Sequence, residues 1–146
     1  MKKYILLFGL LMVAIMASCD DDNFNNNNKY LPNYSFQVPV DMSSPLYSQL
    51  KFAGNAVYVS TVTSGINGIF VTNTGTGFTA FEASCPNQPL DTCSRLTLNG
   101  IMATCPCDNV EYFLYTGQPT GGVKVQYGLK PYRVQQISEN ELLISN

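Results

Sequence analysis

Four cysteines between positions 85 and 107 constrain this chain more than any other feature. They occur in Cys85-Pro86-Asn87, at Cys93, and in Cys105-Pro106-Cys107-Asp108. Four cysteines allow three disulfide pairings, and a bond across Pro106 would close a badly strained ring. Two pairings therefore remain open. The chain has no histidine, so it can form neither a Ser-His nor a Cys-His catalytic couple.

The N-terminus has the features of a lipoprotein signal peptide. Lys2 and Lys3 precede an apolar stretch over residues 5–15, and small residues at 17–18 come directly before Cys19. An apolar stretch this short, followed by small residues, indicates a cleaved signal and not a transmembrane helix. The pattern predicts that Cys19 is lipidated and becomes the mature N-terminus. The alternative is an ordinary secretory signal with a cysteine there by coincidence.

We expect a signal peptide over residues 1–18, a tether over 19–29 and one folded domain over 30–146. The tether contains three consecutive aspartates and an asparagine-rich stretch, with almost no apolar side chains that could pack. Its acidic run resembles the export signal of some surface lipoproteins; a charged spacer is the alternative. The expected location is the cell envelope, with a lipid anchor in the outer membrane and exposure at the surface favoured.

The charges exclude two classes of partner. The chain carries eight basic and ten acidic residues, a formal net charge of −2 at pH 7. It has neither the basic patch that nucleic acid requires nor a Lys/Arg-rich amphipathic helix that could lie on a membrane. We expect membrane attachment through the lipid alone, and the sequence leaves a protein or glycan partner open.

The domain is predicted to be all-β. Apolar side chains alternate with polar ones in short runs, and no 3.6-residue period is sustained. Asn99-Gly100 is a strong hairpin signal because both residues tolerate positive φ. Short strands with turns at this spacing predict a small antiparallel sandwich or partly open barrel. The expected strands are 57–60, 69–72, 78–83, 95–98, 101–104, 132–137 and 141–144.

The cysteine spacing resembles that of Rieske iron–sulfur domains. That family reads Cys-x-His, a spacer of similar length, then Cys-Pro-Cys-His, and it binds one iron through two Cys and the other through two His. Here the His positions hold Asn87 and Asp108. The resemblance covers about residues 57–144 and implies a Rieske-like fold. Its other matching positions are Phe81-Glu82-Ala83, Asn99-Gly100, Tyr112, Thr116-Gly117 and Tyr132-Arg133-Val134.

The resemblance also implies roles for the cysteines. By position, Cys85 and Cys105 are the iron ligands, and Cys107 is half of a disulfide that clamps the two loops. The other half normally stands where this chain has Leu90, so Cys93 is the expected replacement. The family geometry thus favours Cys85–Cys105 and Cys93–Cys107, in an exported chain that meets oxidising conditions.

We expect the cluster to be lost, with no metal or other cofactor in its place. Both imidazoles are missing, and Val110 replaces a serine that in the family hydrogen-bonds the cluster. The sequence therefore favours a non-enzymatic binding or structural module, although it leaves enzymatic activity open. The runner-up is an electron-transfer protein whose [2Fe–2S] centre has altered ligands: Cys85, Cys105 and an oxygen of Asp108.

Three other sites are weaker candidates. Cys105 and Cys107 could form a redox-active thiol pair, but Arg95 is the only cation nearby in sequence. A four-cysteine zinc site is disfavoured because Cys-x-Cys does not match a zinc knuckle. A carboxylate pair is conceivable, but acids in loops are usually solvated. Its candidates are Glu82, Asp91, Asp108 and Glu111. Tyr112, Tyr115, Tyr127 and Tyr132 are expected to fill or rim the core.

Overall fold

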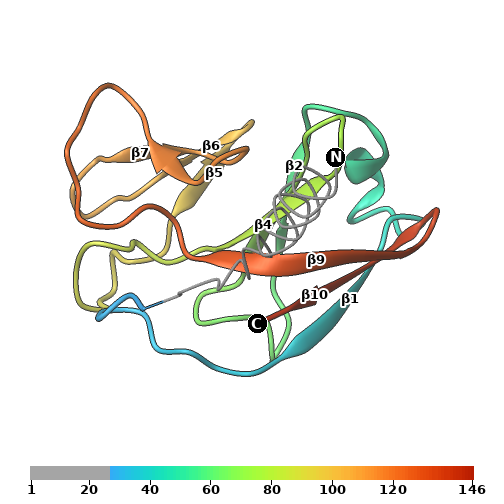
Figure 1. The fold of residues 1–146 in the computed structure, drawn as a ribbon, viewed down its shortest axis with the longest axis horizontal. Helices are drawn as coiled ribbons and strands as arrows, with labels where there is room; N and C mark the ends of the chain where they lie inside the picture. Colours follow the sequence, from blue (N-terminus) through green and yellow to red (C-terminus); the bar gives the residue numbers. More distant parts are fainter. Residues whose placement is uncertain (1–26) are drawn as a thin grey trace, which may run out of the picture.

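The structure is a computed structural model that describes residues 27–146, and the regular secondary structure of these residues is almost entirely β-strand (Figure 1). The predicted signal peptide, Cys19 and most of the tether lie outside the described residues. No helix within residues 27–146 is both long and apolar enough to cross a membrane. The elements are β1 Gln37–Asp41, a 3-10 helix η1 Ser48–Lys51, β2 Ala56–Val59, β3 Ile69–Asn73, β4 Phe78–Glu82, β5 Thr97–Asn99, β6 Met102–Thr104, β7 Glu111–Phe113, β8 Gln118–Pro119, β9 Pro131–Ser138 and β10 Glu141–Ser145.

The larger sheet has six antiparallel strands in the order β1-β10-β9-β4-β3-β2. Its two halves join where β4 meets β9, over the pairs Ala80–Tyr132 and Phe81–Pro131. Pro39 cannot donate a ladder hydrogen bond, and it stands in β1, at the edge of the sheet, where that loss is tolerated. The sheet curls as a partly open barrel (Figure 1).

The smaller sheet has four short strands in the order β5-β6-β7-β8 and lies at one end of the molecule, on the left in Figure 1. The predicted hairpin at Asn99-Gly100 is present, but its turn is one residue later, because Asn99 pairs with Met102. Gly100 has φ +60° at the first central position, the position where a two-residue type II′ turn favours glycine.

Two hydrophobic cores share one wall, formed by β3 and β4. Ile69 and Val71 of β3 face a mainly aliphatic core under the six-stranded sheet. Phe70 and Phe81, on the opposite faces of β3 and β4, belong to a second core beneath the smaller sheet. Because successive side chains of a strand alternate in direction, one pair of strands serves both cores. The small antiparallel all-β fold predicted from the sequence is confirmed.

Candidate functional site

The first cysteine loop follows β4 directly, and backbone hydrogen bonds close it. The Cys85 N–H donates to the Ser94 carbonyl at 2.8 Å, and Ser84 forms an isolated antiparallel bridge with Arg95. Within the loop, the Asp91 N–H donates to the Ser94 hydroxyl at 2.7 Å. The chain therefore returns beside its starting point, and the Cys93 carbonyl oxygen lies 3.9 Å from the Cys85 sulfur.

The second cysteine loop joins β6 to β7 through a tight turn. The Cys105 N–H donates to the Val110 carbonyl at 2.9 Å, and the Asn109 N–H donates to the Cys105 carbonyl at 2.8 Å. Asn109 has φ +57°, a left-handed conformation that asparagine tolerates better than most residues. The Asp108 side chain accepts the Val110 N–H at 3.0 Å, so its carboxylate helps to close the turn.

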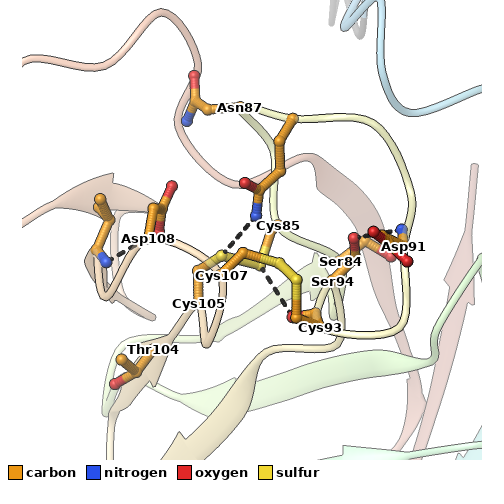
Figure 2. Close-up of a disulfide and its surroundings, with 12 residues drawn as sticks. Ser84, Cys85, Asn87, Asp91, Cys93, Ser94, Thr104, Cys105, Cys107 and Asp108 are labelled. Carbon is orange, nitrogen blue, oxygen red and sulfur yellow. Dashed lines mark hydrogen bonds between the residues drawn. A yellow bond between two sulfur atoms is a disulfide. The ribbon is translucent and has the colours of Figure 1, made fainter.

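Two disulfides join the loops: Cys85–Cys105, with Cα atoms 5.5 Å apart, and Cys93–Cys107, with Cα atoms 5.3 Å apart. This is the pairing that the Rieske resemblance implies. Cys85 and Cys105 are fully buried, whereas Cys93 and Cys107 are partly exposed. The sulfurs of Cys85, Cys105 and Cys107 all lie within 4.8 Å of one another. Figure 2 shows both disulfides between the two loops.

Asn87, at the first degenerate ligand position, points away from the sulfurs (Figure 2). Its amide nitrogen donates to the Tyr112 hydroxyl at 2.9 Å and to the Tyr127 carbonyl at 2.8 Å. Its amide oxygen accepts the Tyr127 N–H at 2.9 Å. All the polar groups of this side chain are therefore engaged in holding the first loop against β7 and the segment around Tyr127. Burial raises the pKa of Tyr112, whose side chain lies in the second core.

Gln88 reaches the buried disulfide from the same loop. Its amide nitrogen lies 3.1 Å from the Cys105 sulfur and donates a hydrogen bond to it. Nothing in the sequence indicated this role, because the contact joins two loops that are distant along the chain.

The segment that precedes β1, residues 27–36, forms a strap over the first loop. The Asn28 side chain donates to the Pro86 carbonyl at 2.8 Å, and Leu31 is 1 % exposed. Tyr30 packs edge-on against Tyr127, with ring centroids 6.3 Å apart. Further along the strap, the Pro32 carbonyl accepts a 2.7 Å hydrogen bond from the ammonium of buried Lys130. The strap therefore contacts the first cysteine loop at Pro86 and the segment that precedes β9 at Tyr127.

Glu82 is buried, so the expectation that it is a solvated acid is wrong. Its carboxylate accepts the N–H groups of Ile66 and Asn67 at 2.7 and 2.9 Å. It also accepts the hydroxyls of Tyr132 and Ser84 at 2.6 and 2.8 Å. Four donors replace the water that burial removes. Asp91, Asp108 and Glu111, the other candidates for a carboxylate pair, are exposed.

The tyrosines fill and rim the core as expected: Tyr112 and Tyr132 are buried, and Tyr115 and Tyr127 are partly exposed. Burial, followed by the charge and the hydrogen bond of Glu82, strongly raises the pKa of Tyr132. These side chains stabilise the walls around the loops, and the described contacts give them no catalytic partner.

The residues present do not fit a Rieske-type [2Fe–2S] group. Two cysteines are available for one iron, but the second iron needs two more ligands. Asn87 has committed its amide to Tyr112 and Tyr127, and Asp108 is exposed and accepts the Val110 N–H. Val110 offers no hydroxyl to the loops. The arrangement has the two joined cysteine loops that the sequence resemblance implies, and it lacks half of the ligand set.

No protein-family model and no curated protein sequence matches this chain. Solved structures are similar in fold. A chain from a complex of reduced oxygenase and oxidized ferredoxin in carbazole 1,9a-dioxygenase is 23% identical, with a TM-score of 0.48, over 75% of this chain and 92% of that one. A putative NADH-dependent nitrite reductase small subunit from Mycobacterium tuberculosis is 15% identical, with a TM-score of 0.46, over 78% and 97%.

The ferredoxin of carbazole 1,9a-dioxygenase from Nocardioides aromaticivorans IC177 is 18% identical, with a TM-score of 0.44, over 73% of this chain and 96% of that one. These identities and TM-scores are too low to indicate a shared ligand or a shared activity.

Proposed function

We propose that this protein is a cell-envelope lipoprotein whose Rieske-like domain has lost its iron–sulfur cluster and serves as a non-enzymatic binding or structural module. The observation that carries the proposal is the engagement of Asn87. Its amide donates to Tyr112 and Tyr127 and accepts from Tyr127, and these three hydrogen bonds hold the side chain away from the sulfurs beside which a second iron would lie.

The same contacts support a structural role for the former ligand loops. Two disulfides, the Asn87 hydrogen bonds and the strap hold the loops together without a metal. Each disulfide closes a loop of moderate length, with sequence separations of 20 and 14 residues. Bridges of this kind contribute about 3 kcal/mol each when the unfolded chain is constrained. For a domain with a stability of roughly 5–15 kcal/mol, that is a large share.

The proposed anchor is a lipid on Cys19, in the outer membrane and with the domain at the surface. Support comes from the sequence alone: a short apolar stretch, small residues, a cysteine and an acidic tether. The partner would be a protein or a glycan. Metabolic labelling with a fatty acid tests the anchor: wild-type protein should be labelled and membrane-bound, and Cys19→Ala should be neither.

An analysis of metal and disulfides tests the loss of the cluster. Full-length protein, purified anaerobically, should be colourless, contain no stoichiometric iron, and give an intact mass about four hydrogens below the fully reduced chain. Reconstitution with iron and sulfide should leave it unchanged. Asn87→His combined with Asp108→His restores both imidazoles and is the matched comparison for reconstitution.

Electron transfer by a centre with altered ligands is the second candidate. The close approach of the Cys85, Cys105 and Cys107 sulfurs favours it, because three thiolates within 4.8 Å could bind iron once reduced. Visible absorption and a paramagnetic signal after dithionite treatment, in protein as isolated, would establish this candidate and overturn the first.

A further inference from the structure

The two disulfides differ in their access to solvent. Cys85 and Cys105 are each 0% exposed, so an external thiol cannot reach their bond in the folded protein. Cys93 and Cys107 are partly exposed, and the neighbours Asp91 and Thr92 are exposed. Thiol–disulfide exchange requires a thiolate to contact the sulfur that it attacks. An external thiol therefore reaches the Cys93–Cys107 bond, the outer disulfide, before it reaches the Cys85–Cys105 bond, the inner disulfide.

One sulfur of the outer disulfide, that of Cys107, lies close to both sulfurs of the inner disulfide. The Cys107 sulfur is within 4.8 Å of the sulfurs of both Cys85 and Cys105, whereas Cys93 does not belong to this group of three. If Cys107 is released as a thiolate, it has two neighbours that it could attack. Attack on Cys105 would close a strained ring across Pro106, so Cys85 is the productive target.

The departing sulfur also has a hydrogen-bond donor in place. When Cys107 attacks Cys85, Cys105 leaves as a thiolate. The Gln88 amide already donates to that sulfur at 3.1 Å. A hydrogen bond to a developing negative charge is stronger than one to a neutral acceptor, so Gln88 favours departure of Cys105.

We infer that the two disulfides form a thiol–disulfide relay that passes exchange from a surface thiol to buried Cys105. In the first step, an external thiolate attacks Cys93, a mixed disulfide forms at Cys93, and Cys107 leaves as a thiolate. In the second step, Cys107 attacks Cys85, the Cys85–Cys107 bond forms, and Cys105 leaves as a thiolate. One S–S bond breaks and one forms in each step, so the relay needs no other oxidant or reductant. This activity does not depend on the anchor, but it rests on the part of the proposed function that leaves Cys85 and Cys105 joined as a disulfide and not bound to iron.

Two single variants of the full-length chain provide a matched test. Cys93→Ser leaves the Cys107 thiol beside the buried bond, whereas Cys107→Ser leaves the Cys93 thiol; each variant lacks the outer disulfide. At pH 8, free thiols are trapped with an alkylating agent and located by peptide mass spectrometry. We expect about tenfold more labelled Cys105 in Cys93→Ser than in Cys107→Ser. At pH 5, where few thiols are ionised, labelled Cys105 should accumulate far more slowly.

Wild-type protein provides a second test that is independent of how the variants fold. After a short exposure to limiting glutathione, the relay predicts glutathione on Cys93, the alkyl label on Cys105, and a Cys85–Cys107 bond. The inference is overturned if glutathione is on Cys93 and the label is on Cys107. Equal labelling of Cys105 in the two single variants would also overturn it.

Discussion

The six-stranded sheet and the cysteine-loop end, meaning the sheet β5–β8 with its two cysteine loops, are stabilised by different interactions. The first encloses a core of largely aliphatic side chains, and β9 alone runs for 8 residues. The second has strands of only 2 or 3 residues, and it depends on two disulfides and on side-chain bonds such as those of Asn87. Where ladders are too short to fix the register, covalent and side-chain bonds replace them.

The wall formed by β3 and β4 separates the aliphatic core from the cysteine-loop end. Val71 and Ala80 pack into the aliphatic core, and Phe70 and Phe81 pack beneath the smaller sheet. Asn87 and Asp108 lie in the loops, outside β3 and β4, the two strands of this wall. The comparison therefore predicts that damage to the loops and damage to the sheet have separable effects.

The largest effect is expected in the aliphatic core. Leu142→Ala removes a fully buried side chain and should lower the free energy of unfolding by about 4 kcal/mol, through lost burial and a residual cavity. Leu143→Ala is the matched control, because the Leu143 side chain is partly exposed and lies on the opposite face of β10 from Leu142. Urea denaturation measures both variants. Equal losses would contradict the placement of the core.

Removal of the inner disulfide should come next. Cys85→Ala with Cys105→Ala should cost about 3 kcal/mol, because the unfolded chain regains the entropy of an open loop. Hydrogen exchange sharpens the comparison: amides of β5, β6 and β7 should lose protection, whereas those of β10 should keep most of theirs. Uniform loss of protection over both sheets would show that the two regions unfold as one unit.

Asn87→Ala should have a somewhat smaller effect. It leaves the buried Tyr112 hydroxyl and the Tyr127 backbone without their partners and should cost about 2 kcal/mol. Tyr112→Phe, which removes only one of the three hydrogen bonds, should cost about half as much. If Asn87→Ala were neutral in thermal and urea unfolding, Asn87 would not be a structural contact.

Tyr132→Phe should have the smallest effect at neutral pH, about 1 kcal/mol for one hydrogen bond. The substitution should have a clearer effect on how the free energy of unfolding depends on pH above about 10. Because the pKa of Tyr132 is raised in the folded protein above its ordinary 10.0, the unfolded chain binds fewer protons above pH 10. The free energy of unfolding therefore falls as pH rises through that value.

The variant should lose stability less steeply than the wild type above pH 10, as measured by urea unfolding at several pH values. Tyr112, whose pKa burial also raises, should leave a residual slope of the same sign. Burial lowers the pKa of Lys130 below its ordinary 10.5. Below that pH, Lys130 therefore makes the free energy of unfolding rise with pH, and it does so in both the wild type and the variant. Parallel curves would mean that Tyr132 ionises alike in both states.

Sequence periodicity was sufficient to predict the fold class. It also predicted the strands whose two faces differ in polarity and the strands that flank clear turns. It did not predict β1, where Pro39 interrupts the pattern and the partner, β10, is at the other end of the chain. The cysteine frame indicated which loops would meet. It could not show that Asn87 binds a segment 40 residues away, or that Glu82 is buried among four donors, because both depend on long-range contacts.

The strap has a consequence for orientation. Asn28 binds Pro86 at the cysteine-loop end, and a lipid on Cys19 would be separated from Asn28 by nine residues. Even fully extended, a chain of that length spans only about 30 Å. A molecule anchored in this way would hold its disulfides close to the headgroups and its six-stranded sheet farther out, so reagents would approach Cys93 along the bilayer surface.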